Sequence, residues 1–195
     1  MKTVLVFLCL VPMIAFTQDP GPDRQIRELK NTLLLVELRD AGMASEALKT
    51  SGELTKATRM ERKVREQNLK IASAFREYFH FCPVYFFYDQ SRDEVKRMHF
   101  QGNLLDHDLA PVQSVSRPVP MFYAAAFGYL DARPAGSKSG RHVKALMIRD
   151  HNFVQLKEPF PYYVRTCSLD SHYGKKVKKL NKKLDAYYHS LTSGH

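Results

Sequence analysis

The stretch from residue 32 to residue 88 constrains the fold most, because a long amphipathic segment lies between two short apolar runs. Residues 32–38 and 84–88 are almost entirely aliphatic or aromatic, which is typical of buried strands. Between them, apolar residues recur at steps of three, four or seven from 53 to 79, and charged residues fill the other positions. The pattern predicts a strand, a long helix and a second strand.

The rest of the chain extends this unit into a mixed α/β domain. The further predicted elements are a short helical turn at 26–30, helices at 41–49, 91–98 and 175–191, strands at 121–130 and 143–149, and an extended segment at 159–164. The resulting order, β-α-β-α-β-β-α, is that of a thioredoxin-like fold, in which Pro120 would take the place of a frequent cis-proline. An open doubly wound sheet is the alternative architecture.

The N-terminus has the layout of a secretory signal peptide. Lys2 precedes an apolar run over residues 4–16, and Ala15 and Thr17 are small residues at the −3 and −1 positions of a cleavage site. The run is shorter than the roughly 20 residues that span a bilayer, and no later run approaches that length. We therefore predict a signal peptide at 1–17, and an exported, soluble protein that is periplasmic or secreted.

After cleavage, residues 18–195 would form a single basic domain. Its loss of Lys2 lowers the formal net charge from +10 to +9. A hydrophobic fraction of 44% is sufficient for a core. The positive charge favours anionic partners.

The late helix concentrates this charge. Its lysines, opposite an apolar stripe, are Lys175, Lys176, Lys178, Lys179, Lys182 and Lys183. They predict binding to an anionic polymer or membrane surface. The alternative is a packed terminal helix with a solvated face. No specific nucleic-acid motif accompanies them.

Two cysteines remain in the exported chain, Cys82 and Cys167. If the segments at 84–88 and 162–165 were antiparallel neighbours, the two sulfurs could form a disulfide. The alternative is two buried free thiols. The spacing matches neither a zinc site nor a CxxC redox motif.

Two clusters resemble catalytic or metal-binding loops: Asp106-His107-Asp108 and Asp150-His151-Asn152. Imidazole and carboxylate groups can act in acid/base hydrolysis or bind zinc or manganese, provided that the fold brings together both clusters, or His99 with one of them. The candidate catalytic residues are His107, Asp108, Asp150 and His151. The same tripeptides also occur in ordinary turns.

A resemblance bears on export. The segment from Phe81-Cys82-Pro83 to Tyr88, the segment Pro159-Phe160-Pro161-Tyr162-Tyr163-Val164-Arg165 and the lysine-rich helix resemble a family of uncharacterised exported bacterial proteins, mostly from Bacteroidota. The likeness covers most of the chain after the signal peptide. It implies export and a single domain, and the family carries no assigned activity.

Together these features predict an exported, soluble binding or accessory module for an anionic partner, without a metal ion or cofactor. The alternative hypothesis is a metal-assisted or acid/base hydrolase that uses the loops at 106–108 and 150–151. Whether the protein is an enzyme, and its oligomeric state, are left open by the sequence.

Overall fold

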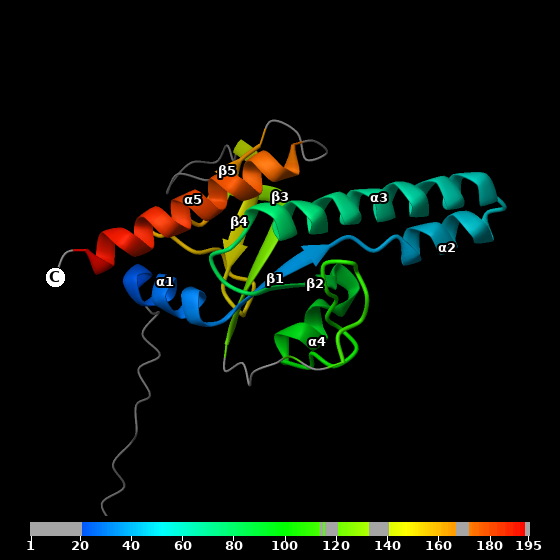
Figure 1. Cartoon of the computed structure of the whole chain (residues 1–195). Helices are drawn as coiled ribbons and strands as arrows, with labels where there is room; N and C mark the ends of the chain where they lie inside the picture. The colour runs from blue at the N-terminus through cyan, green and yellow to red at the C-terminus, as the bar shows by residue number, and fades with distance from the viewer. Residues whose placement is uncertain (1–20, 114, 116–120, 133–140, 167–171, 194–195) are drawn as a thin grey trace, which may run out of the picture.

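The computed structural model describes residues 21–113, 115, 121–132, 141–166 and 172–193. Its strands form one mixed sheet in the order β2-β1-β3-β4-β5, with helices on both faces (Figure 1). The strands are β1 (Leu33–Leu38), β2 (Val84–Tyr88), β3 (Phe122–Ala132), β4 (Arg141–Arg149) and β5 (Tyr163–Arg165). The helices are α1 (Pro22–Asn31), α2 (Gly42–Thr50), α3 (Leu54–Tyr78), the 3-10 turn η1 (Asp89–Ser91), α4 (Arg92–Lys96) and α5 (Tyr173–Thr192).

Strand β1 is the middle strand of a parallel half-sheet. It pairs in the parallel sense with β2 and β3, so that Val36 lies level with Phe86 on one side and with Ala125 on the other. Strand β4 is antiparallel to β3, and β5 is antiparallel to β4. The predicted α/β class with a mixed sheet is therefore confirmed. In the parallel half, β1 connects to β2 through α2 and α3. Helix α3 covers one face of the sheet and α4 lies on the other, as in doubly wound sheets.

The main core lies on the sheet face covered by α1, α3 and α5. The side chains that are wholly buried there include Leu34, Val36, Phe86, Ile26, Phe75 and Leu180. Each fully buried side chain of this kind stabilises the fold by about 1.5–3 kcal/mol. Because this cluster is much larger than the one on the other face, it supplies most of the hydrophobic stabilisation.

The opposite face is covered by α4 and the segments around it. Val95 of α4 is completely buried among side chains of β1, β2 and β3. The Phe153 ring joins this cluster, with its centroid 5.9 Å from that of Phe87 and 6.2 Å from that of Phe122. The two faces of the sheet thus carry separate apolar clusters.

Polar contacts hold α5 against α3 and against the beginning of β2. The side-chain amide of Gln67 on α3 donates a 2.9 Å hydrogen bond to the Tyr173 hydroxyl. The side-chain oxygen of Asn181 on α5 accepts the backbone N–H groups of His80 and Phe81, at 2.7 and 3.0 Å. These bonds satisfy backbone donors just after α3 ends, where no helical partner is available.

The two edge strands of the sheet, β2 and β5, differ in how their outer edges are protected. On the free side of β2, Leu105 exchanges a pair of backbone hydrogen bonds with Phe86, at 2.7 and 2.9 Å. On the other side, β5 is only three residues long. Leu105 thus covers part of the outer edge of β2, and β5 presents only a short outer edge.

Several predictions made from the sequence concern residues outside the described ranges. They are the signal peptide at 1–17, the possible cis-proline at Pro120, and Cys167. Among the described residues, no helix combines the length and apolar character needed to cross a membrane.

Candidate functional site

The six lysines of α5 lie on its outer side. The inner side is formed by Tyr173, Val177, Leu180 and Leu184, which recur at steps of three and four and are at most 5% exposed. The lysines fill the remaining positions: Lys175, Lys176, Lys178, Lys179, Lys182 and Lys183. Lys176 is half-buried and the other five are exposed. The predicted apolar and basic sides of this helix are confirmed.

None of these six lysines has an ion-pair partner within the described ranges. Two of them approach aromatic rings instead. The ammonium of Lys178 lies 6.0 Å from the centroid of the Tyr78 ring. That of Lys183 lies 5.5 Å from the Tyr163 ring and donates a 3.2 Å hydrogen bond to the Tyr163 carbonyl. Among the described residues, folding therefore brings no carboxylate within ion-pair distance of the α5 lysines.

Helix α3 adds to this charge. It carries seven lysines and arginines against three glutamates, and α5 carries six lysines against one aspartate. The two packed helices thus hold +9 of the formal net charge of +10. Arg59, Lys63 and Lys70 lie along one exposed side of α3, which also carries Glu66 and Glu77. Lys70 and Glu77 line the same groove between the helices as Lys175. The basic layer, as we call it, consists of Arg59, Lys63, Lys70 and the six lysines of α5.

The first of the two aspartate-histidine clusters is a hydrogen-bonded turn. One side-chain oxygen of Asp106 accepts the backbone N–H groups of Asp108 and Ala110, at 2.8 and 2.9 Å. The N–H of Leu109 donates to the carbonyl of Asp106 at 3.1 Å. Hydrogen bonding to the charged carboxylate, above all from Ala110, lowers the pKa of Asp106. Asp106 thus holds the loop together.

The second cluster is a copy of the first. The side chain of Asp150 accepts the N–H groups of Asn152 and Val154, at 2.9 and 2.8 Å. Phe153 has a left-handed φ of 63°, and Leu109 at the equivalent position has a φ of 60°. A type I turn followed by a left-handed residue is a common hairpin connection, and aspartate is favoured at its first position. Turn formation therefore accounts for the repeated Asp-His pattern.

The structure does not bring together the four residues proposed for a hydrolase, His107, Asp108, Asp150 and His151. The His107 ring packs against Phe86, with 5.3 Å between centroids, on the face that α3 covers. Phe153 of the second turn packs against Phe87 on the opposite face. Nowhere in the described ranges do three or more His, Cys, Asp or Glu residues gather closely enough to hold a metal ion. The two clusters therefore pack against opposite faces of the sheet, and the hydrolase hypothesis stays a prediction.

The possible disulfide between Cys82 and Cys167 required the strands beside them, β2 and β5, to be neighbours, and in the sheet they are not. Strand β2, which Cys82 precedes, and β5, which Cys167 follows, lie at opposite edges with three strands between them. Cys82 is a buried free thiol. Burial raises its pKa to about 12, although the nearby charge of Lys30 acts in the other direction. A neutral, buried thiol is a poor nucleophile, so Cys82 is a core residue.

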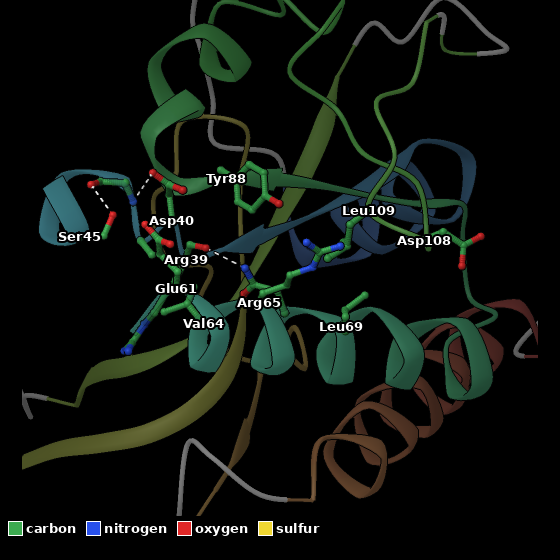
Figure 2. Close-up of a pocket in the computed structure, with 13 residues that line it drawn as sticks. Arg39, Asp40, Ser45, Glu61, Val64, Arg65, Leu69, Tyr88, Asp108 and Leu109 are labelled. Atoms are coloured by element: carbon green, nitrogen blue, oxygen red, sulfur yellow. Dashed lines mark hydrogen bonds between the residues drawn. The ribbon is translucent and has the colours of Figure 1, made fainter. Parts of the chain in front are cut away.

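A cavity of about 490 Å³ lies at the carboxyl ends of β1 and β2, against α3 (Figure 2). It is lined by Arg39, Asp40, Ala41, Gly42, Ser45, Glu61, Val64, Arg65, Asn68, Leu69, Tyr88, Asp108 and Leu109. Asn68 is 3% exposed and donates a 2.8 Å hydrogen bond to the Arg39 carbonyl, which anchors the end of β1 on α3. One residue of the predicted site, Asp108, belongs to this cavity.

Each carboxylate that lines the cavity already has a partner. Asp108 forms an ion pair with Arg76. Glu61 lies 2.9 Å from the ammonium of Lys49, and this contact is the main cause of its lowered pKa. Asp40 accepts the backbone N–H two residues further along the chain, at 2.9 Å. The acidic groups of the cavity are thus engaged in local structure.

The two cationic groups of the cavity are not engaged in this way. Neither Arg39 nor Arg65 has an ion-pair partner within the described part of the chain. Figure 2 shows the guanidinium of Arg65 reaching from α3 across the cavity toward Leu109, below the ring of Tyr88. The cavity therefore contains two guanidinium groups that no carboxylate of the described residues neutralises by direct contact.

Reasoning from the sequence missed these cavity residues, although one signal was present. Arg39 and Asp40 directly follow the first predicted strand. In open α/β sheets, ligands bind outside the carboxyl ends of the parallel strands, so polar residues at that position are candidates. Arg65 carried no such signal, because it is one of many basic residues on a long helix.

Comparisons with known proteins add no assignment. The chain matches no family model, no curated protein and no solved structure.

Proposed function

We propose that this protein is an exported binding or accessory module that holds a linear anionic partner on its basic layer. The observation that carries the proposal is the set of six α5 lysines without carboxylate partners in the described structure. They lie within nine residues of α5, from 175 to 183, a length of about 12 Å. This dense cluster of positive charge suits a partner with closely repeated negative charges. Lysine ammonium groups are mobile point charges and favour charge density over a fixed ligand shape.

An anionic polymer fits this surface better than a membrane. A helix that lies in a membrane interface presents a free apolar side to the lipid. The apolar side of α5 is buried against the sheet, and the large apolar side chains that the described residues expose lie elsewhere: Met43, Leu54, Leu69, Met98, Tyr129 and Val154. The attraction is therefore electrostatic, and its strength should depend steeply on salt.

Heparin, a sulfated polysaccharide, is a suitable probe of this proposal. We expect the protein to be retained at low salt, and the variant Lys178→Glu/Lys179→Glu/Lys182→Glu to elute at a clearly lower salt concentration. The slope of log K against log[salt] should also fall in magnitude by about three for the loss of three contacts.

The matched control reverses three other exposed charges, in the variant Lys96→Glu/Lys157→Glu/Arg165→Glu. It has the same net charge as the first variant but an intact basic layer. Equal losses in both variants would mean that net charge alone causes retention, and would contradict the proposal. Binding to vesicles of anionic phospholipid without binding to heparin would replace the polymer by a membrane surface.

Export, the resemblance to an uncharacterised exported family and the thioredoxin-like fold remain predictions within this proposal. Intact-mass spectrometry on protein exported by a bacterial host tests the first of them. A mature chain that begins at Gln18 would support export. A chain retained in the cytoplasm with residues 1–17 intact would contradict it.

A further inference from the structure

We infer that the cavity between β1, β2 and α3 is a second binding site, which takes a small anion with an apolar body. It is separate from the basic layer, because Arg65 faces the cavity whereas Arg59, Lys63 and Lys70 lie on another side of α3. The inference therefore does not depend on the proposed function.

The position of the cavity is the first argument. Arg39 directly follows β1, and Tyr88 is the last residue of β2, so both stand at the carboxyl edge of the parallel half-sheet. Ligands of open α/β sheets bind outside this edge. A volume of about 490 Å³ lies within the range of small-molecule sites, roughly 300–1,000 Å³.

The charge of the lining is the second argument. Asp40, Glu61 and Asp108 are each held by a donor or a cation, as described above. Arg39 and Arg65 remain without a carboxylate. A guanidinium can donate two parallel hydrogen bonds to a carboxylate or phosphate, which gives both affinity and orientation.

The apolar lining defines the rest of the ligand. Val64, Leu69 and Leu109 line the cavity around Arg65, and the Tyr88 ring lies above it (Figure 2). A ligand that places its anionic group on Arg65 can therefore bury a hydrocarbon or aromatic group against these side chains. Its chemistry is that of a small carboxylate or phosphate monoester with an apolar substituent.

Benzoate and phenyl phosphate are probes with these properties, and they differ only in the anionic group. We would titrate each into ¹⁵N-labelled protein and follow the amide resonances. The resonances of Gly42, Ser45 and Asn68 should shift and saturate for at least one probe. The probe that binds more tightly identifies the anionic group that the site prefers.

Two variants on the same helix test the role of the guanidinium. Arg65→Gln should weaken binding about tenfold or more, since it removes charge-assisted hydrogen bonds. Arg59→Gln is the matched control, because Arg59 is also exposed and unpaired within the described structure but does not line the cavity. It should leave the affinity unchanged.

Other results would overturn the inference. One is the absence of shifts at Gly42, Ser45 and Asn68 with both probes up to about 10 mM, a range that detects even weak binding. Another is equal weakening by Arg65→Gln and Arg59→Gln, which would mean that the probes respond to the general charge of α3.

A further result would support the inference. Loss of heparin binding in the α5 triple variant, with intact benzoate binding, would show that this site is separate from the basic layer.

Discussion

Gly174 of α5 lies so close to Tyr78 of α3 that a Cβ atom on Gly174 would be 2.5 Å from Cε2 of the tyrosine ring. The nearby atom belongs to a ring, which cannot bend aside like the end of a flexible chain. The absence of a side chain at Gly174 therefore allows the two helices of the basic layer to approach each other.

This contact predicts the effect of Gly174→Ala. Alanine in a helix normally gains about 0.5–1 kcal/mol over glycine. Here we expect a net loss of about 1–3 kcal/mol in the free energy of unfolding, because the methyl group forces α3 and α5 apart. Urea unfolding measures the change. Gly128→Ala is the control, since its Cβ would meet only the Met147 methyl group, at 3.7 Å. Equal stability of both variants would refute the packing argument.

The second turn predicts a contrast between an aspartate and its neighbouring histidine. Asp150→Ala removes an acceptor for two backbone N–H groups and should lower the free energy of unfolding by about 1–2 kcal/mol. Among the hydrogen bonds of the described residues, the His151 side chain contacts only that of Asn152, one residue away. His151→Ala should therefore change the free energy of unfolding by less than about 0.5 kcal/mol. Thermal unfolding of the two variants distinguishes them. A larger effect of the histidine would require a role for it that the turn does not explain.

The first turn predicts part of the acid sensitivity. The pKa of Asp106 is lowered from its ordinary value of 3.8 by the hydrogen bonds in the folded state. Its contribution to stability is therefore complete above about pH 5 and is lost progressively as the pH falls through the folded-state pKa. Asp106→Asn keeps an oxygen acceptor but does not titrate. Below pH 3.8, the free energy of unfolding of the Asp106→Asn variant should fall less steeply with decreasing pH than that of the unmodified protein. Parallel curves of unfolding free energy against pH for the two proteins would contradict this prediction.

The buried thiol predicts low reactivity. With a pKa of about 12, only about one Cys82 side chain in ten thousand is ionised at pH 8, and the residue is 8% exposed. In a chain that begins at Gln18 and carries Cys167→Ser, a thiol reagent at pH 8 should modify Cys82 only after denaturant is added. Rapid modification of the folded protein would show that this part of the core opens.

The sequence was sufficient to predict the elements in which a hydrophobic pattern repeats over several helical turns or strand residues. The spacing of Val177, Leu180 and Leu184 predicted the buried side of α5, and the two apolar runs predicted β1 and β2. Helix α1 was underestimated as a short turn at 26–30. It begins at Pro22, since proline at a first helical position loses no hydrogen bond that the helix would have made.

Contacts between distant parts of the chain could not be predicted in the same way. Which strand lies beside which is decided by the packing of the whole sheet, so the separation of Cys82 from the end of β5 was not readable from their local patterns. The cavity likewise joins Arg39, Arg65 and Leu109, which come from three separate segments. The Asp-His clusters were ambiguous for a different reason. The same residue types suit a turn and a catalytic loop, and only the hydrogen bonds seen in the structure identify the turns.

The bonds between Leu105 and Phe86 have a consequence for how copies of this protein meet. An uncovered outer strand is a template on which another chain can add a strand, and growth in this way leads to fibres or aggregates. On β2, Leu105 takes up the backbone hydrogen-bonding groups of Phe86 that another strand would use. Strand β5 has three residues, which is too short for stable addition of a further strand. We therefore expect strand addition at these two edges to be disfavoured in concentrated solutions of the folded protein.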